Sequence, residues 1–473
     1  MSPVEVAVLR AQFAERLSEV YGREVPAYTR LVEASSAVNR QVMMNEGVQA
    51  ERLGSVDRVT AERHGAIRVG TPEELNQVAR ILGAFGMHPV GFYDLRDTAD
   101  SSIPVVSTAC RPIDAAELDR NPFRVFCSML VPEDRRFFDA SMQARLEEFL
   151  GARRIFGDRL LELADKCEAT GLSESEAEEF LTEAVAAFEI SSEPVPKEWY
   201  RELEQISAVA ADIGGVTSTH INHLTPRVRD IDELYRVMSA SGITMIDAIQ
   251  GPPRWEGPDL LLRQTSFRAL EERRRFIDAD GEISEGSLRV RFGEVEARGI
   301  APTPEGRRRY EEAIARIEAA RTDGTMDARN DAAAAVWREY FPDSEQGLHR
   351  DGLAYFTYAV PADRPGAEPP AAADVEELLS GGWLVAEPIV YEDFLPRSAA
   401  GIFSSNLVEA GAKNGEHDGA GYDLARLSTL IGRPIADPDE LYRQQSQTSL
   451  NAATDALGLP RTTPTPAPTV AHI

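Results

Sequence analysis

Two histidines, His64 and His223, occupy matching positions in an internal repeat of the chain. Residues 64–75 read HGAIRVGTPEEL and residues 223–234 read HLTPRVRDIDEL, and the two align without a gap. The matching pairs are His64 and His223, Arg68 and Arg227, Val69 and Val228, Glu74 and Glu233, and Leu75 and Leu234. Imidazole nitrogen is a good ligand for divalent transition metals. The repeat therefore favours a metal site to which each half contributes one histidine.

A third ligand is expected from the last strand of each half. Aligning the phenylalanines of FRVFCSML and RVRFGEVEARG sets Ser128 opposite Glu294, so the second half offers a carboxylate where the first offers a hydroxyl. Two histidines and one carboxylate leave coordination positions open, as in non-heme iron(II) oxygenases. A 2-oxo acid can fill two of these positions through its carboxylate and ketone, which leaves a third for oxygen.

Neighbouring residues offer alternatives to two of these ligands. His220 precedes His223 in HINHL, and only the gap-free repeat favours His223. Glu296 shares a strand face with Glu294, and only the phenylalanine alignment separates them. The remaining histidines, which have no counterpart in the pattern, are expected to be structural or exposed: His88, His349, His417 and His472.

Arg68 is the candidate substrate-binding residue. Residues two and four apart in a strand share a face, so Arg68 should point to the same side as His64. Its guanidinium fork suits a substrate carboxylate. For Arg227 we expect an ion pair instead, and Cys127 is interpreted as a small core residue. Gln264 either lines the cavity or is a hydrogen-bonded strand residue.

The elements that must position these residues follow the same order in both halves. After each histidine strand comes a helical pattern, EELNQVARILGAFGMH ending near Gly86 and DELYRVMSASGI ending near Gly242. Strand candidates follow at 88–95, 103–110 and 123–130 in the first half, and at 243–251, 259–270 and 287–299 in the second. We therefore predict an α+β fold in which two βαβββ modules meet at their first strands and form a curved mixed sheet around the metal site.

The rest of the chain divides by composition and periodicity. Between and beyond the modules the pattern is charged and helical, or rich in proline and alanine, and the sequence ends in LPRTTPTPAPTVAHI. The expected segments are an N-terminal helical segment 1–58, a first module 59–135, a helical insertion 136–212, a second module 213–300, a helical segment 301–345, a C-terminal cap with strands 346–458, and a disordered tail 459–473.

Composition limits the classes of function. Acidic residues outnumber basic ones by 78 to 50, and the resulting net charge of −28 makes nucleic-acid binding improbable. No apolar run is long enough to span a membrane. The N-terminal stretch carries charges within its apolar pattern, so it predicts an amphipathic helix rather than a signal peptide, and a cytoplasmic protein. The three cysteines have no spacing typical of a disulfide framework or a zinc ribbon.

Paired βαβββ units with ligands on their first and last strands resemble the vicinal oxygen chelate superfamily. FGEVEARG is similar to the strand that carries the metal glutamate in 4-hydroxyphenylpyruvate dioxygenase, which favours Glu294 over Glu296. Four motifs in order, ERHGAIRVGTPEEL, HINHLTPRVRDID, RFGEVEARGIAPTPEGR and SAAGIFSSNL, resemble the 2-oxoadipate dioxygenase/decarboxylase family, also called hydroxyglutarate synthase. This resemblance covers nearly the whole chain.

The resemblance implies iron(II) as cofactor and conversion of 2-oxoadipate and O2 to D-2-hydroxyglutarate and carbon dioxide, in lysine breakdown. It also implies that His64, His223 and Glu294 bind the metal beside the substrate, and that Arg68 binds the substrate. The segment LPRSAAGIF should add contacts near Arg397 and Ser398. The family has an apolar residue where Arg397 stands, and this departure leaves the preferred 2-oxo acid open.

Two other functions fit parts of the pattern. A glyoxalase-type isomerase would use similar paired units with a more symmetric ligand set, which the hydroxyl of Ser128 disfavours. A non-enzymatic small-molecule binding protein would need no metal. The ligand types alone do not separate iron from manganese, cobalt or nickel, and the sequence does not indicate an oligomeric state.

Overall fold

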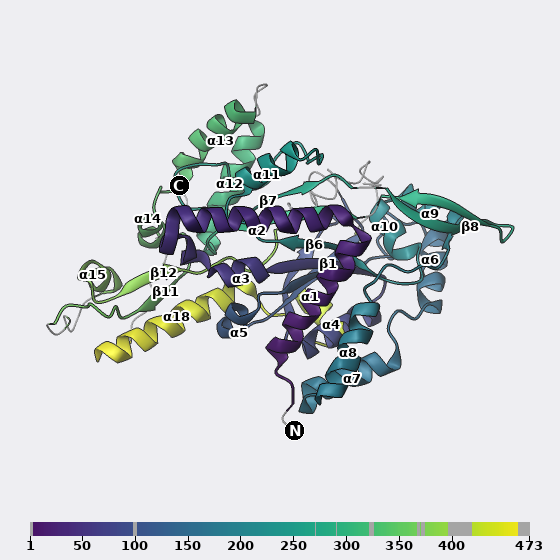
Figure 1. The fold of residues 1–473 in the computed structure, drawn as a ribbon, viewed down its shortest axis with the longest axis horizontal. Coiled ribbons are helices and arrows are strands. Elements are labelled where there is room, and N and C mark those ends of the chain that lie inside the picture. Colours follow the sequence, from purple (N-terminus) through teal and green to yellow (C-terminus); the bar gives the residue numbers. More distant parts are fainter. Residues whose placement is uncertain are drawn as a thin grey trace.

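A computed structural model of the chain describes residues 3–97, 102–269, 271–289, 291–320, 326–366, 369, 374–395 and 419–461. It has an α+β architecture of mixed sheets covered by helices (Figure 1). The largest sheet holds five strands in the order β2-β3-β4-β1-β6. These strands are β1 Arg63–Val69, β2 His88–Asp94, β3 Val105–Arg111, β4 Arg124–Leu130 and β6 Ile221–Pro226.

The two halves of the chain meet at their first strands. β1 pairs antiparallel with β6, with Ala66 opposite His223 and a register shift after Ala66. On its other side β1 pairs in parallel with β4. In the second half β10 (Gly293–Arg298) pairs antiparallel with β7 (Leu262–Phe267), and a parallel bridge between Arg227 and Glu296 places β10 beside β6. Moving outward from the seam, each half thus presents its first, last and third strands, which confirms that two related units meet at their first strands.

The second module departs from the prediction at its second strand. Residues 243–251 were expected to form a strand, but they meet β7 only at two isolated bridges, Met245 to Phe267 and Gln250 to Gln264. A bend at residues 247–248 interrupts the ladder between these bridges. Since Gly251 has a φ of 104° and two prolines follow it, the pairing also ends there.

A second departure lies between β7 and β10. The expected strand at 287–299 is divided, because residues up to Leu288 belong to a separate hairpin of β8 (Glu272–Ile277) and β9 (Ile283–Leu288). This hairpin forms a three-stranded sheet with β5 (Val195–Pro196) and projects from the body of the molecule (Figure 1). Its β9 side chains are mostly exposed, so no apolar alternation marks it in the sequence.

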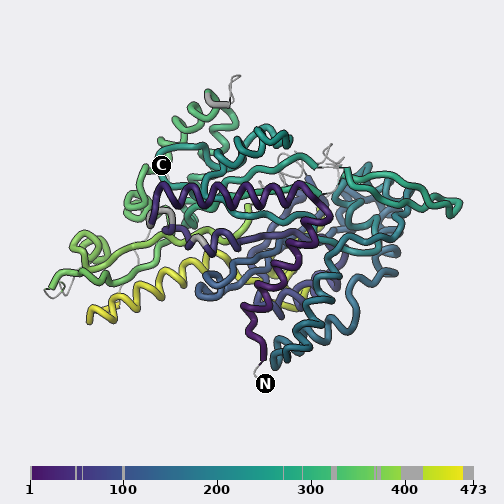
Figure 2. Tube along the Cα trace, in the orientation of Figure 1, coloured from purple at the N-terminus to yellow at the C-terminus, as the bar shows by residue number. Residues whose placement is uncertain are grey.

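Corresponding helices pack on the two modules. α4 (Pro72–Ala84) begins at Thr71, whose side chain accepts a hydrogen bond from the Glu74 amide, and α11 (Ile231–Ala240) begins in the same way at Asp230. Two N-terminal helices, α1 (Val6–Glu24) and α2 (Pro26–Glu46), lie over the seam between the modules. In Figure 2 the purple trace of α2 runs alongside teal strands from the middle of the chain.

The other elements surround this core. The charged stretch after the first module is helical, as predicted, and so is the stretch after the second. The remaining elements are η1 Gly47–Leu53, α3 Val56–Ala61, α5 Ala115–Arg120, α6 Ala140–Ala152, α7 Asp158–Thr170, α8 Glu174–Ala186, α9 Lys197–Glu204, α10 Ala208–Gly214, α12 Pro304–Ala319, α13 Met326–Tyr340, α14 Glu345–Arg350, β11 Phe356–Ala359, α15 Val375–Ser380, β12 Val385–Pro388, α17 Leu424–Ile431 and α18 Pro438–Leu457. None of the described helices combines the length and apolar composition that a bilayer crossing requires.

Candidate metal centre

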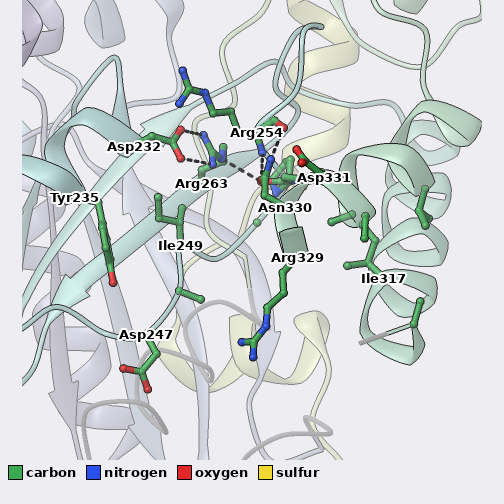
Figure 3. Close-up of a pocket in the computed structure, with 18 of the residues that line it drawn as sticks. Asp232, Tyr235, Asp247, Ile249, Arg254, Arg263, Ile317, Arg329, Asn330 and Asp331 are labelled. Carbon is green, nitrogen blue, oxygen red and sulfur yellow. Dashed lines mark hydrogen bonds and ion pairs between the residues drawn. The ribbon is translucent and has the colours of Figure 1, made fainter. Parts of the chain in front are cut away.

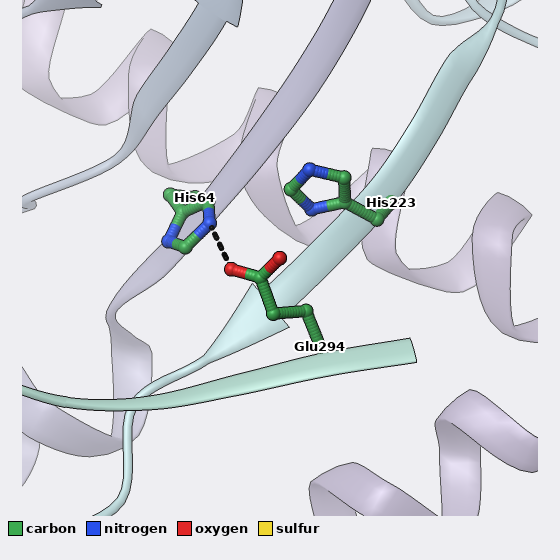
Figure 4. Close-up of side chains that lie close together, drawn as sticks. All are labelled: His64, His223 and Glu294. Carbon is green, nitrogen blue, oxygen red and sulfur yellow. Dashed lines mark hydrogen bonds and ion pairs between the residues drawn. The ribbon is translucent and has the colours of Figure 1, made fainter. Parts of the chain in front are cut away.

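Three side chains from both halves of the chain meet where the modules join. His64 comes from β1, His223 from β6 and Glu294 from β10 (Figure 4). One potential ligand atom of each lies within 4.8 Å of the others, and all three residues are buried. The imidazole rings of His64 and His223 are nearly perpendicular, with centroids 5.4 Å apart. The antiparallel pairing of β1 with β6 produces this approach.

Polar neighbours orient both histidines. Nε2 of His64 lies 3.1 Å from Glu294 Oε1, and its Nδ1 lies 3.1 Å from Glu296 Oε1. Nδ1 of His223 lies 3.1 Å from the hydroxyl of Thr225. Each Nδ1 thus faces a polar neighbour, so Nε2 is the nitrogen left for a metal. Carboxylate and hydroxyl partners of this kind fix ring orientation in metal sites.

The charges of the site match its ligand types. Burial alone would lower the pKa of His64, but the carboxylates of Glu296 and Glu294 raise it. Burial, together with the charges of His64 and Arg68, lowers the pKa of His223 well below its usual value, so this ring is neutral. Burial raises the pKa of Glu294, whereas Arg298 and His64 outweigh burial at Glu296 and lower its pKa to about 2. His64 Nε2 and Glu294 Oε1 lie at hydrogen-bonding distance, 3.1 Å, and a cation bound between them would take the place of the proton.

A buried network of arginines and glutamates holds Glu296 in place. Arg298 donates to both oxygens of Glu296, with Nε 2.6 Å from Oε1. Glu62 accepts hydrogen bonds from Arg124 at 2.7 Å and Arg227 at 2.9 Å, and Arg124 continues to Glu392. The ion pair expected for Arg227 is therefore confirmed. The network joins the ends of β1, β4, β6 and β10, next to the three candidate ligands.

This arrangement fits a divalent metal. It offers two imidazole nitrogens and one carboxylate, the mixed donor set that non-heme iron(II) and related sites use. Aromatic rings line its sides, because Phe394 packs against His64 with centroids 4.9 Å apart and Phe292 stacks on His223 at 5.6 Å. Among the described residues, no other group of histidine, cysteine and acidic side chains has this spacing.

Arg68 lies on the strand of His64 and is held by an acid. Its Nη1 donates to Asp212 Oδ2 at 2.5 Å, and both side chains are buried. Asp212 also accepts from Asn222 at 2.9 Å and lies 3.6 Å from His220. Burial lowers the pKa of His220 to about 4. His220 is thus part of the surroundings of Arg68, whereas His223 lies with the other two candidate ligands.

The register of the strands corrects the alignment that selected Glu294. Arg68 lies opposite Ser128 in the first module, and Arg227 lies opposite Glu296 in the second. Because the two arginines are equivalent in the repeat, Ser128 corresponds to Glu296, and Phe126 corresponds to Glu294. The phenylalanine alignment is therefore shifted by two residues, which is the period of side-chain alternation in a strand. Such a slip keeps the same face inward, so the alternating pattern could not reveal it.

Other predicted residues have less direct roles or lie outside the description. Ser128 accepts a hydrogen bond from Ser107 at 2.9 Å, and Cys127 is a buried core residue. Gln264 is buried opposite Glu296 and donates to Gln250 at 3.4 Å. Arg397 and Ser398 lie outside the described residues. Sequence reasoning missed Glu62, Thr225 and Asp212, whose importance depends on contacts that join distant segments.

A separate groove of about 850 Å³ lies on the outer side of the second module. It is bordered by α11, the segment 247–254 and helices α12 and α13 (Figure 3). Arg263 projects into it from β7 and pairs with Asp232 at 2.7 Å. The groove includes none of the three candidate metal ligands.

Known proteins resemble this chain over most of its length. A family model described as 2-oxoadipate dioxygenase/decarboxylase matches residues 13–406. A protein of that name from Mycobacterium tuberculosis is 54% identical over 445 residues, covering 94% of this chain and 98% of the relative. One from Escherichia coli is 39% identical over 450 residues, covering 93% and 96%. The crystal structure of hydroxyglutarate synthase from Pseudomonas putida in complex with 2-oxoadipate aligns with a TM-score of 0.81 and 36% identity, covering 97% and 100%.

Proposed function

The chain belongs to the 2-oxoadipate dioxygenase/decarboxylase family, and from this premise we propose that it oxidises 2-oxoadipate with O2 to D-2-hydroxyglutarate and carbon dioxide, using iron(II). One observation supports the proposal most strongly. His64, His223 and Glu294, from three strands and both halves of the chain, are buried with potential ligand atoms within 4.8 Å of one another. A divalent metal would give these three buried donors a common partner.

Iron(II) is the proposed metal because the donor set is two imidazoles and one carboxylate. When bound, the ion supplies oxygen activation and Lewis acidity, which amino-acid side chains lack. The chain's own contribution is to hold the donors in position. Glu296 orients the His64 ring through Nδ1, and Thr225 does the same for His223. Manganese, cobalt and nickel would fit the same donors.

Arg68 is the proposed partner of a substrate carboxylate. It projects from the same strand as His64, and Asp212 fixes one edge of its guanidinium group. A guanidinium held in this way can bind a carboxylate through its planar fork and orient the chain of a 2-oxo dicarboxylic acid. Arg397 and Ser398 are proposed to add contacts from the segment that follows Leu395.

The aromatic surroundings are proposed to keep bulk water away from the reacting atoms. Phe394 and Phe292 pack against the two histidines, and Phe126 packs against Phe394 with centroids 5.1 Å apart. Excluding water strengthens the electrostatic interactions that orient the substrate and limits side reactions. The reaction needs no second organic substrate, because the atoms of 2-oxoadipate and O2 together equal those of 2-hydroxyglutarate and carbon dioxide.

Oxygen consumption tests this proposal. Protein loaded with iron(II) should take up O2 when 2-oxoadipate is added, and should take up less with 2-oxoglutarate, releasing one carbon dioxide per O2. His223→Ala and Glu294→Ala should abolish the uptake, whereas His88→Ala, a change at an exposed histidine, should not. Uptake only with another 2-oxo acid would overturn the substrate. No uptake with any 2-oxo acid, despite bound metal, would contradict the oxygenase and favour an isomerase.

A further inference from the structure

In the described part of the chain, the segments that carry His223 and Glu294 pair with each other at a single bridge, just beyond the end of β6. Among the described residues, the parallel pairing of β6 with β10 is limited to the bridge between Arg227 and Glu296. There the Val228 amide donates to the Glu296 carbonyl at 2.8 Å. Toward His223 and Glu294 no further bridge links the described residues, so contacts outside a ladder contribute to the distance between the two strands.

Tyr21 of α1 supplies that contact from outside the sheet. Its hydroxyl lies 3.1 Å from the carbonyl oxygen of Asn222 and 2.9 Å from that of Phe292, and donates to them. Asn222 directly precedes His223, and Phe292 lies two residues before Glu294. A hydroxyl has one proton, so the two carbonyls share it in a three-centre hydrogen bond. One side chain thus connects the two strands beside their candidate ligands.

The surroundings of Tyr21 keep the hydroxyl in this position. The residue has no exposed surface, and burial raises its pKa, so the hydroxyl stays protonated and able to donate. The guanidinium of Arg291 lies over the ring, 5.4 Å from its centroid. Arg291 in turn pairs with Glu272 at 2.5 Å and with Glu24. The last turn of α1 therefore makes two kinds of contact: Tyr21 bonds to the carbonyls beside the candidate ligands, and Glu24 pairs with Arg291.

We propose that Tyr21 is a positioning residue of the metal centre: its hydroxyl sets the separation of β6 and β10, and with it the spacing of His223 and Glu294. The inference rests on the proposed metal site. It does not make Tyr21 a ligand, because among the described residues the hydrogen-bond partners of its hydroxyl are backbone carbonyls. Removing the hydroxyl takes away the hydrogen bond that connects these two carbonyls, and the strands can then move relative to each other. Partners outside the ligand set commonly change metal affinity by about 10-fold or more when they are lost.

Tyr28 provides a matched control for the test. It is a buried tyrosine whose ring packs edge-on against Tyr21, with centroids 5.0 Å apart. Its hydroxyl lies 2.7 Å from the Ser18 hydroxyl. Tyr28→Phe therefore removes a partly buried hydrogen bond from the same cluster, and that bond involves neither β6 nor β10. If Tyr21 contributes only to stability, the two variants should change alike. If Tyr21 positions the strands, only Tyr21→Phe should change metal binding.

The experiment titrates the full-length protein with cobalt(II) under anaerobic conditions and records its visible absorption. We expect Tyr21→Phe to weaken cobalt binding by about 10-fold and to shift the absorption bands, which depend on ligand geometry. Tyr28→Phe should match the unaltered protein in both. Equal affinity and identical spectra for all three proteins would overturn the inference.

A second variant tests the inference if Tyr21→Phe does not fold. Glu24→Gln keeps the hydroxyl but weakens the hold of α1 on Arg291, so it should shift the cobalt affinity in the same direction by less. Unchanged affinity in a folded Glu24→Gln protein would then count against the inference. Cobalt binding needs no substrate, so the two proposals can fail separately. Weaker cobalt binding by Tyr21→Phe, together with no oxygen uptake by the unaltered protein, would contradict only the proposed function. Oxygen uptake by the unaltered protein, together with unchanged cobalt binding by Tyr21→Phe, would contradict only this inference.

Discussion

His64 is held between two carboxylates, and this has a consequence for metal uptake. Glu296 and Glu294 raise its pKa against the effect of burial, so in the metal-free protein the ring keeps its proton to higher pH than an ordinary histidine. A metal must displace that proton before it can bind Nε2. Below the raised pKa the proton competes with the metal, and above it the competition ends.

We therefore predict that the apparent metal affinity falls as the pH is lowered through the pKa of His64. One released proton corresponds to about a tenfold change in dissociation constant per pH unit. Titrations with manganese(II) between about pH 6 and pH 8 would measure this. An affinity that does not vary over that range would contradict the protonation state assigned to His64.

The two repeat-related arginines should respond differently to the same change. Arg68→Lys removes the planar fork proposed to bind the substrate, so we expect KM for 2-oxoadipate to rise by about 10- to 100-fold with a smaller effect on kcat. Arg227→Lys alters the pair with Glu62 and should lower stability while leaving KM unchanged. Steady-state kinetics and thermal unfolding of both variants would separate the roles. A similar rise in KM for both would refute a special role for Arg68.

For single residues, the internal repeat predicted the candidate ligands better than the alternation of side chains within each strand did. It selected His223 over His220 because Arg68 and Arg227 confirm the register, and the structure brings His223 to His64. Two arguments favoured Glu294 over Glu296. The phenylalanine alignment is contradicted by the strand register, whereas the resemblance of FGEVEARG to a glutamate-bearing strand agrees with the position of Glu294 beside the histidines. Both glutamates face inward on one strand, and only the pairing of β10 with distant strands separates their roles.

Buried ion pairs between glutamates and arginines connect the ends of the four central strands, β1, β4, β6 and β10. Glu62, Glu296 and Glu392 are buried, yet their pKa values are lowered, to about 2 for Glu296 and Glu392, because arginines face each of them. A carboxyl whose pKa is lower in the folded state stabilises the fold above its unfolded pKa, about 4.3 for glutamate. That stabilisation is lost as the pH falls from there toward about 2.

Glu62→Gln should therefore lower the free energy of unfolding by about 3 to 5 kcal/mol at neutral pH, since it leaves buried arginines without their partner. Below about pH 4 the difference from the unaltered protein should shrink, because the unfolded form of the unaltered protein then gains a proton on Glu62, whereas its folded form binds that proton only at lower pH. Guanidinium unfolding at a series of pH values measures this. Glu178→Gln, in an exposed pair with Arg16, should have little effect at any pH. A difference independent of pH would argue against the charge of Glu62.

Element prediction succeeded where periodicity reflects burial. Strands β1 to β4 and helices α4 and α11 were expected from alternating or helical apolar patterns, and they form at those positions. The β8–β9 hairpin was missed because its side chains are largely exposed and give no apolar alternation. Its only signal is Asp280 and Gly281, a dipeptide typical of turns, with a φ of 85° at Gly281.

For the whole molecule, the proposed metal ties together segments more than 200 residues apart. Because its ligands come from both modules, bound metal should stabilise the native fold as a unit, by about 2.7 kcal/mol when free metal is 100 times its dissociation constant. We predict that a chelator lowers the midpoint of thermal unfolding. His223→Ala should have a low midpoint that the chelator no longer changes, whereas His88→Ala should keep the response. A chelator effect that persists in His223→Ala would contradict the assigned site.

The arrangement of the whole molecule was only partly predictable. The repeat indicated that the modules meet at their first strands, because matching histidines imply matching environments. It could not indicate that α1 and α2 lie over that seam, where Tyr21 contacts β6 and the residue that directly precedes β10. Such contacts depend on how segments far apart in the chain pack together, and a single sequence gives no measure of them.

Anomalous diffraction from crystals grown with iron(II) under anaerobic conditions would locate the metal itself. We expect one strong peak at the iron absorption edge, bounded by Nε2 of His64, Nε2 of His223 and the carboxylate of Glu294, at bonding distance from all three. A peak beside His220 and Asp212, or no peak in protein that retains iron, would contradict this assignment.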